Sequence, residues 1–327
     1  MTATTPRREF LKQGAAAALA MSAGAALAPE ARSAEPTRGH PHPNVPIVDC
    51  HQHLWDLNRF WLPWLETAPP ILSRSYLPPH YAHETAGLHL AKSIYMEVDL
   101  APEQQLAEAE WVIGQCEDDS TPTVAAVISG RPIQPAFRAF AARFKDSPYI
   151  KGFRRVLHPP SLPRGHCLQP EFVKNMRFLG EIGKSYDIVI RNTEISDGAK
   201  LAELCPDTRF ILDHCGNGDV QAKDRSQWRR DIASIARRPN VICKISGIIA
   251  SADHDHWKYE DLEPLVKHCI AEFGWDRVIF AGDWPVCTLT APLREWVACL
   301  KWIVRDAKPE QVRKLFHDNA VAFYGLT

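Results

Sequence analysis

The chain has 327 residues, of which 45% are hydrophobic, and its 38 basic and 39 acidic residues leave a net charge of −1. This length accommodates one large α/β barrel or two domains of ordinary size, with enough apolar residues for a large core. Because the charges balance and no basic stripe with interleaved aromatic residues occurs, nucleic acid is excluded as a partner, and a small molecule is expected instead.

The first 34 residues are expected to form an export signal. Arg7 and Arg8 precede Phe10-Leu11-Lys12, and an alanine-rich, uncharged run follows over residues 14–28. This order resembles a bacterial twin-arginine signal, and the run is too short to span a bilayer comfortably. We therefore expect cleavage of residues 1–34 after recognition by the twin-arginine export machinery. A periplasmic or secreted location follows, with no stable membrane span after cleavage.

A linker over residues 35–44 is expected to lead into one domain over residues 45–327. In this domain short β-like runs alternate with amphipathic segments, and the pattern repeats eight times. The expected strands cover residues 47–53, 93–98, 123–128, 150–157, 188–191, 210–214, 241–246 and 278–282. The expected helical segments cover residues 102–116, 132–144, 170–184, 196–204, 226–237, 261–273 and 292–304, followed by short helices over 309–316 and 319–324. Eight βα units predict an α/β fold, a closed parallel (βα)8 TIM barrel.

His51 and His53 end the first expected strand. Alternate residues of a strand face the same side, so the two imidazoles are expected to project together, about 6 to 7 Å apart. Neutral imidazole is the commonest metal ligand and a frequent general base, so the pair suits a mononuclear metal site or a polar clamp for substrate. Alone, such a pair is more often solvated or hydrogen bonded, and the rest of the chain must decide.

The active site of a (βα)8 barrel lies at the C-terminal ends of the strands. The polar residues expected there are His51, His53, Glu97, Asp99, Arg154, Arg155, Arg191, Asn192, Asp213, His214, Lys244, Ser246 and Asp283. Arg154 and Arg191 are expected to bind a carboxylate or the hydroxyl groups of a substrate, unless they pair with acids such as Glu97. For Lys244 we expect a salt bridge inside the barrel.

A long loop over residues 54–79 is rich in tryptophan and proline and begins with Leu54-Trp55. Loops of this length are usually functional or tightly packed. The aromatic residues either plug the edge of the barrel or form one wall of the substrate pocket, with Trp55 as a substrate contact.

The nine cysteines are scattered, and none forms a Cys-x-x-Cys motif. Cys50, Cys215 and Cys243 lie in or against apolar runs, where cysteine behaves as a small buried hydrophobic residue. We therefore expect neither a structural zinc site nor a redox pair.

Five segments together resemble the amidohydrolase-2 branch of the amidohydrolase superfamily. They are His51-x-His53, Leu212-Asp213-His214-Cys215-Gly216, Cys243-Lys244-Ile245-Ser246-Gly247, Gly282-Asp283-Trp284-Pro285 and Asn319-Ala320-x-x-Phe323-Tyr324-Gly325-Leu326. The resemblance covers residues 45–326. Within the branch, the chain looks closest to the sugar-lactonase and 2-pyrone-4,6-dicarboxylate lactonase group.

The resemblance implies that His51, His53, His214 and Asp283 line one pocket, with Asp283 as the general base that activates water and His214 as a second catalytic residue. The same four side chains would hold one divalent ion, Zn²⁺ or Mn²⁺. The group also includes members that work without metal. The alternative is therefore that the ion is dispensable or absent. Two-metal members of the superfamily carry a bridging, carboxylated lysine on the fourth strand, and this chain has Lys151 only at the start of that strand. The resemblance therefore implies no two-metal site.

The expected function is therefore hydrolysis of a lactone, either an aldono-lactone or a carboxylated lactone. Two alternatives stay open. One is an amide or imide hydrolase, or a decarboxylase, of the same superfamily. The other is a sugar-binding barrel without catalytic activity.

Overall fold

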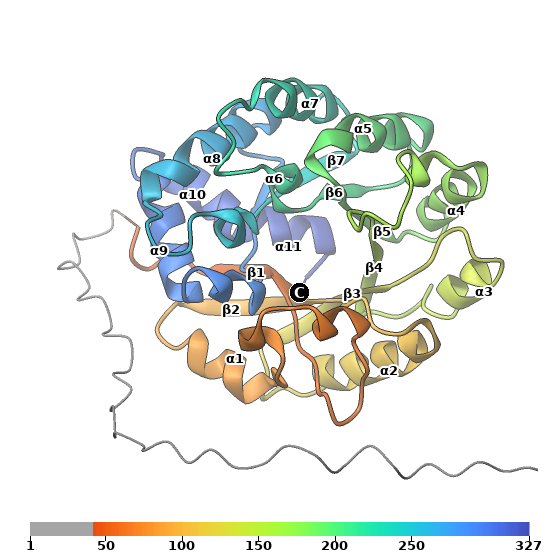
Figure 1. Cartoon of the computed structure of the whole chain (residues 1–327). Helices are drawn as coiled ribbons and strands as arrows, with labels where there is room; N and C mark the ends of the chain where they lie inside the picture. The colour runs from red at the N-terminus through yellow and green to blue at the C-terminus, as the bar shows by residue number, and fades with distance from the viewer. Residues whose placement is uncertain (1–41, 327) are drawn as a thin grey trace, which may run out of the picture. The chain divides into compact units, whose positions relative to one another are not determined.

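The computed structural model describes residues 42–326, so the expected export signal and most of the linker lie outside the described residues. Eight parallel strands form one sheet in the order β1 to β8 (Figure 1). The end of β1 (Ile47–Gln52) pairs with the segment that follows β8 (Val278–Phe280). The N–H of Asp283 donates to the carbonyl of His51, and the N–H of His53 donates to the carbonyl of Trp284, each at 2.8 Å. The predicted (βα)8 barrel is therefore confirmed.

The other strands are β2 (Leu90–Met96), β3 (Thr123–Ser129), β4 (Ile150–Val156), β5 (Ser185–Val189), β6 (Phe210–Leu212) and β7 (Val241–Ile245). The helices are α1 (Pro78–Glu84), α2 (Gln105–Cys116), α3 (Phe137–Ala142), α4 (Pro170–Glu181), α5 (Ile195–Leu204), α6 (His214–Asn217), α7 (Ser226–Ala236), α8 (Tyr259–Phe273), α9 (Leu293–Ile303), α10 (Pro309–Arg313) and α11 (Asn319–Tyr324). In Figure 1 most of them form a ring around the strands. α1, α4 and α10 each begin with proline, whose missing N–H costs nothing in the first turn.

Several element boundaries differ by a few residues from the sequence prediction, and β5 and α1 are the differences that matter for the site and the loop before it. β5 begins at Ser185 and ends at Val189, whereas the prediction placed this strand over residues 188–191. The polar side chains of Ser185 and Asp187 interrupt the apolar run, but both lie fully buried inside the sheet. The prediction also missed α1. This helix begins at two consecutive prolines, and such a sequence is typical of a loop.

One end of the barrel is closed by α11. Ala320 and Tyr324 of this helix belong to a buried apolar cluster that also contains Val48, Ile211 and Ile279 from inside the barrel. A ligand therefore has to enter from the opposite end, where the strands finish.

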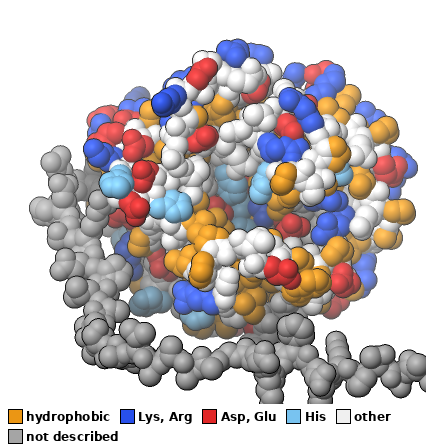
Figure 2. Space-filling model, viewed as in Figure 1, with side chains coloured by type: hydrophobic (Ala, Val, Ile, Leu, Met, Phe, Trp, Pro, Cys, Tyr) orange, Lys and Arg blue, Asp and Glu red, His pale blue; other side chains and the backbone are white. Residues whose placement is uncertain are grey.

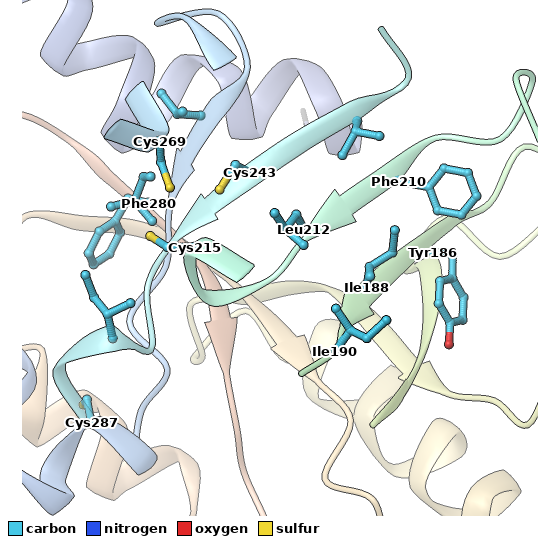
Figure 3. Close-up of a cluster of buried hydrophobic side chains, with 14 of the residues drawn as sticks. Tyr186, Ile188, Ile190, Phe210, Leu212, Cys215, Cys243, Cys269, Phe280 and Cys287 are labelled. Carbon is cyan, nitrogen blue, oxygen red and sulfur yellow. The ribbon is translucent and has the colours of Figure 1, made fainter. Parts of the chain in front are cut away.

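All nine cysteines are free, and all but Cys116 are buried. Figure 3 shows the sulfur atoms of Cys215, Cys243 and Cys269 close together near Phe280, and the three atoms lie within 4.8 Å of one another. Burial raises the pKa of the Cys243 and Cys269 thiols well above the ordinary value. These cysteines pack in the apolar core, as the sequence predicts.

Between residues 42 and 326 no helix has the length and apolarity needed to cross a membrane.

Candidate active site

A cavity of about 420 Å³ opens at the C-terminal ends of the strands. The face in Figure 2 is hollowed near its centre, and histidine and acidic side chains are visible in the hollow. Of the residues predicted from the sequence, His53, Trp55, Arg154, His214 and Asp283 line this cavity. His51 is fully buried and lies behind the lining residues, in contact with them. The structure thus gathers six of the seven predicted site residues.

Three imidazoles surround one carboxylate oxygen. Oδ1 of Asp283 lies 3.6 Å from Nε2 of His51 and 3.5 Å from Nε2 of His53. Nε2 of His214 lies 3.9 Å from the same oxygen. Burial lowers the pKa of His51 well below its ordinary value and also lowers that of His214, so both rings are neutral near pH 7.

The backbone at two of these residues is strained. His214 and Asp283 each have a φ of 55°, in the left-handed region that non-glycine residues seldom adopt. Asp283 is fixed there by the hydrogen bond of its N–H to His51, and its carbonyl accepts from the N–H of Cys287 at 2.9 Å. Such strain is typical of functional sites, where the surrounding structure enforces one side-chain direction.

Hydrogen bonds fix which ring nitrogens carry a lone pair. Nδ1 of His53 lies 3.0 Å from the carbonyl oxygen of Met96, which only accepts, so the proton is on Nδ1. Nη1 of Arg154 lies 3.0 Å from Nε2 of His51, and a guanidinium only donates. Nε2 of His51 therefore presents a lone pair, and Nε2 of His53 lies 3.1 Å from it. A cation near these two nitrogen atoms and the carboxylate of Asp283 would bind that lone pair.

Arg154 is held from several sides beneath the cavity. Its Nε donates to Oε1 of Glu97 at 2.7 Å, and its Nη2 donates to the carbonyl of Glu97 at 2.8 Å. Nη1 also lies 3.4 Å from Oδ2 of Asp213. Burial opposes the charge, but Glu97 and Asp213 outweigh it and raise the pKa of Arg154 above its ordinary value. Arg154 therefore pairs with Glu97, which was one of the two possibilities left open by the sequence. It nevertheless lines the cavity.

Lys244 forms the predicted salt bridge inside the barrel. Its ammonium contacts Asp187, and its Nζ lies 3.1 Å from Oδ1 of Asp213. Burial acts to lower the pKa of Lys244, but the two carboxylates raise it overall. For Asp213, burial is outweighed by Lys244 and His51, which hold its pKa well below the ordinary value. Burial raises the pKa of Asp187 to about 7.

Arg191 does not lie among the cavity-lining residues, contrary to the sequence prediction. Because β5 ends at Val189, Arg191 stands outside the strand. Its guanidinium donates to Glu194 at 2.8 and 2.9 Å and to the carbonyls of Pro159 and Leu162. These bonds tie the loop after β4 to the segment after β5, which is a structural role.

The sequence prediction placed Asp213 at the strand ends without assigning it a role, and it did not name Asp187. Asp213 precedes the predicted His214 and contacts His51, Arg154 and Lys244. Its place between an apolar run and a histidine was the available signal. Asp187 gave a similar signal, because a lone acid within the apolar strand β5 needs a cation, and Lys244 is that cation.

Gly247, directly after β7, leaves room for His214. A Cβ at this position would lie 2.4 Å from Cγ and Nδ1 of His214. We therefore expect Gly247→Ala to displace the imidazole and to break its 3.0 Å contact with Ser246. The variant should lower kcat/KM at least tenfold, which corresponds to an activation free energy higher by roughly 1.4 kcal/mol or more. The matched control is Gly274→Ala, since Gly274 has a φ of 71° against 69° for Gly247 but nothing within 4 Å. Both kcat/KM and Tm are measured for the two variants. Equal losses of kcat/KM would show that backbone strain rather than the clash is responsible.

A buried carboxyl group near Arg154 makes stability depend on pH. Glu108 on α2 accepts hydrogen bonds from the Tyr95 hydroxyl and the Val98 N–H, each at 3.0 Å. Burial and the nearby Glu97 raise the pKa of Glu108 from 4.5 to about 8. The folded chain therefore keeps a proton that the unfolded chain loses above pH 4.5, so this contribution to stability falls as the pH rises towards 8.

We expect Glu108→Gln, which retains both acceptor contacts and does not titrate, to flatten the pH dependence of the free energy of unfolding. The slope between pH 5 and pH 8 should decrease by about 1.4 kcal/mol per pH unit, measured by urea denaturation. Parallel curves for the variant and the wild type would mean that Glu108 is ionised in the fold.

A sequence model of the family described as amidohydrolase matches residues 48–326. The chain belongs to the amidohydrolase family. The expectation from the five sequence motifs is thereby confirmed, and so is the expectation that the protein is a hydrolase. Among its relatives, the protein y4mH of Sinorhizobium fredii is 27% identical over 86% of this chain and 99% of its own length. An L-fucono-1,5-lactonase of Burkholderia multivorans is 23% identical over 85% of this amidohydrolase and 96% of its own length.

Solved structures agree on the fold. A Burkholderia multivorans amidohydrolase crystallised with bound zinc has a TM-score of 0.78 and 23% identity, and the match covers 86% of this chain and all of that chain (100%). A putative 2-pyrone-4,6-dicarboxylic acid hydrolase from Pseudomonas putida has a TM-score of 0.66 and 15% identity, with coverages of 86% and 98%. The predicted likeness is therefore found in sequence to a sugar lactonase and in fold to a 2-pyrone-4,6-dicarboxylic acid hydrolase.

Proposed function

We propose that this amidohydrolase opens a lactone with a water molecule activated by Asp283. The observation that carries the proposal is the position of this carboxylate, which faces the cavity among His51, His53 and His214. A general base needs a free acceptor at the place where the water sits, and a held carboxylate supplies one. The likeness to an L-fucono-1,5-lactonase supports an ester bond within a ring as the target.

In this reaction Asp283 takes a proton from water while the water oxygen attacks the lactone carbonyl. The bond between the carbonyl carbon and the ring oxygen then breaks, and the proton passes from Asp283 to the departing oxygen. The product is an open-chain hydroxy acid, which releases one proton at neutral pH. His214, which faces the cavity beside Asp283, contacts the carbonyl oxygen as negative charge develops on it.

The four side chains also fit a single divalent ion. Ligand atoms of His51, His214 and Asp283 lie within 4.8 Å of one another, and Nε2 of His53 joins them from the cavity side. Imidazole nitrogen atoms and a carboxylate are a donor set that zinc and manganese accept. A bound ion would polarise the carbonyl and lower the pKa of water. Nη1 of Arg154 competes for the lone pair of His51.

We expect purified protein to hold about one equivalent of a divalent ion per chain, measured by elemental mass spectrometry. His53→Ala should reduce this occupancy several-fold, because it removes one ligand. His158→Ala is the matched control, since His158 lines the same cavity but is outside the group His51, His214 and Asp283, whose ligand atoms lie within 4.8 Å of one another, and should leave the occupancy unchanged. Metal-free wild type with full activity would show that the histidines act without an ion.

The reaction class is tested by supplying wild type with lactones, with cyclic imides and with unsaturated carboxylic acids. Proton uptake or release reports hydrolysis, and carbon dioxide release reports decarboxylation. We expect turnover of lactones only. Turnover of imides or release of carbon dioxide would favour the alternative enzymes of the superfamily. Tight binding of sugars without any turnover would favour the inactive sugar-binding barrel.

A further inference from the structure

The charges around the cavity do not suit an anionic substrate. Arg154 is the only lysine or arginine that lines the cavity among residues 42–326. Its guanidinium is already bound by Glu97 and faces Asp213. Two further carboxylates, those of Asp99 and Asp283, face the cavity as well. A carboxylate on the substrate would therefore meet two acids, and no lysine or arginine of the lining is free to pair with it.

Much of the lining is apolar. We define the apolar wall as Trp55, Trp64, Val98, Val156, Val189 and Val286. The indole N–H of Trp55 donates to the carbonyl of Arg74 at 2.6 Å, and that of Trp64 donates to the carbonyl of Val98 at 2.8 Å. Both tryptophans therefore offer only hydrocarbon surface to a ligand.

Two polar side chains beside the wall, Asn217 and Ser251, already donate hydrogen bonds within the protein. The amide of Asn217 donates to the carbonyl of Ile190 at 2.7 Å, and the hydroxyl of Ser251 donates to the carbonyl of Ile248 at 2.9 Å. A ring with several hydroxyl groups needs donors and acceptors for each of them. Hydroxyl groups buried here without partners would lose the hydrogen bonds they make in water.

We propose that the substrate is an uncharged lactone with an apolar substituent, which packs on the apolar wall while its carbonyl faces Asp283. This inference rests on the proposed lactone hydrolysis and narrows its substrate. It departs from the aldono-lactones and carboxylated lactones that the sequence suggested, because the sequence did not show that Arg154 and the tryptophan N–H groups are engaged.

The test compares kcat/KM, divided by the rate constant of spontaneous hydrolysis, for δ-valerolactone, δ-octalactone and D-glucono-1,5-lactone. Each methylene that enters the wall should raise kcat/KM about fourfold, so δ-octalactone should exceed δ-valerolactone at least tenfold. It should also exceed D-glucono-1,5-lactone at least tenfold. A highest value for D-glucono-1,5-lactone, or for the anionic lactone of isocitrate, overturns the inference but leaves lactone hydrolysis in place. If no lactone is hydrolysed, the proposed function itself fails.

Two variants connect the preference to the wall. Val156→Thr and Val286→Thr add a hydroxyl without changing shape, and both positions are only partly buried, so folding should tolerate them. Each should lower the preference for δ-octalactone over D-glucono-1,5-lactone at least threefold. Val321→Thr on α11 is the matched control, because Val321 is also partly buried but lies against the closed end of the barrel. An unchanged preference in both wall variants contradicts the proposal.

Discussion

Asp283→Asn is expected to lower kcat for lactone hydrolysis about a thousandfold or more, with KM changed only a few-fold. Asparagine has the size of aspartate but cannot take a proton from water. Asp283 has only 6% of its side chain exposed, and it lines the cavity in contact with His51 and His53. Steady-state kinetics by proton release measure the effect, with circular dichroism to show that the variant is folded.

The matched control is Asp99→Asn, which removes the other acidic side chain that lines the cavity. Asp99 lies 3.6 Å from Arg131, and burial raises the pKa of Asp99 to about 6. We expect this variant to keep kcat within tenfold of wild type. A thousandfold loss in Asp99→Asn, with Asp283→Asn nearly as active as wild type, would identify Asp99 as the base instead.

Lys244→Met is expected to lower the free energy of unfolding by about 3 to 5 kcal/mol at pH 8. Methionine fills a similar volume but leaves the fully buried Asp187 and Asp213 without their shared cation. Because the pKa of Asp187 is already about 7, acid lets this carboxyl take a proton in the variant. The loss should therefore be smaller at pH 5.5 than at pH 8, which urea denaturation at the two pH values measures.

The double variant Lys244→Met with Asp187→Asn separates charge from packing. Removing one uncompensated carboxylate should restore a large part of the lost stability at pH 8. A double variant that is less stable than Lys244→Met alone would mean that the cost comes from lost packing of the lysine.

The barrel and the centre of the site were predictable because short stretches of sequence encode them. His51-x-His53 follows an apolar run, and Asp283 follows another, so each falls at the end of a strand whatever the rest of the chain does. Strand ends of a parallel barrel meet on one face, and the structure brings these residues within 3.6 Å of one another.

The position and the ion-pair partners of the two arginines were not predictable, because they depend on contacts between distant segments. Arg154 and Arg191 look equivalent in the sequence, but Glu97 and Asp213 hold Arg154 below the cavity while Glu194 holds Arg191 outside it. A shift of two residues in the end of β5 decides the second case. The same limit explains why the substrate that we propose differs from the one expected from the sequence, since the engagement of the tryptophan N–H groups depends on contacts with distant segments.

The most direct measurement is hydrolysis of δ-octalactone in ¹⁸O-labelled water by wild type and by Asp283→Asn, with mass spectrometry of the hydroxy acid. Attack of an activated water on the carbonyl puts one label into the carboxylate, and we expect wild type to form this product at least a thousandfold faster than the variant. Label in the hydroxyl group, or equal rates for the two proteins, would contradict carbonyl attack by water activated at Asp283.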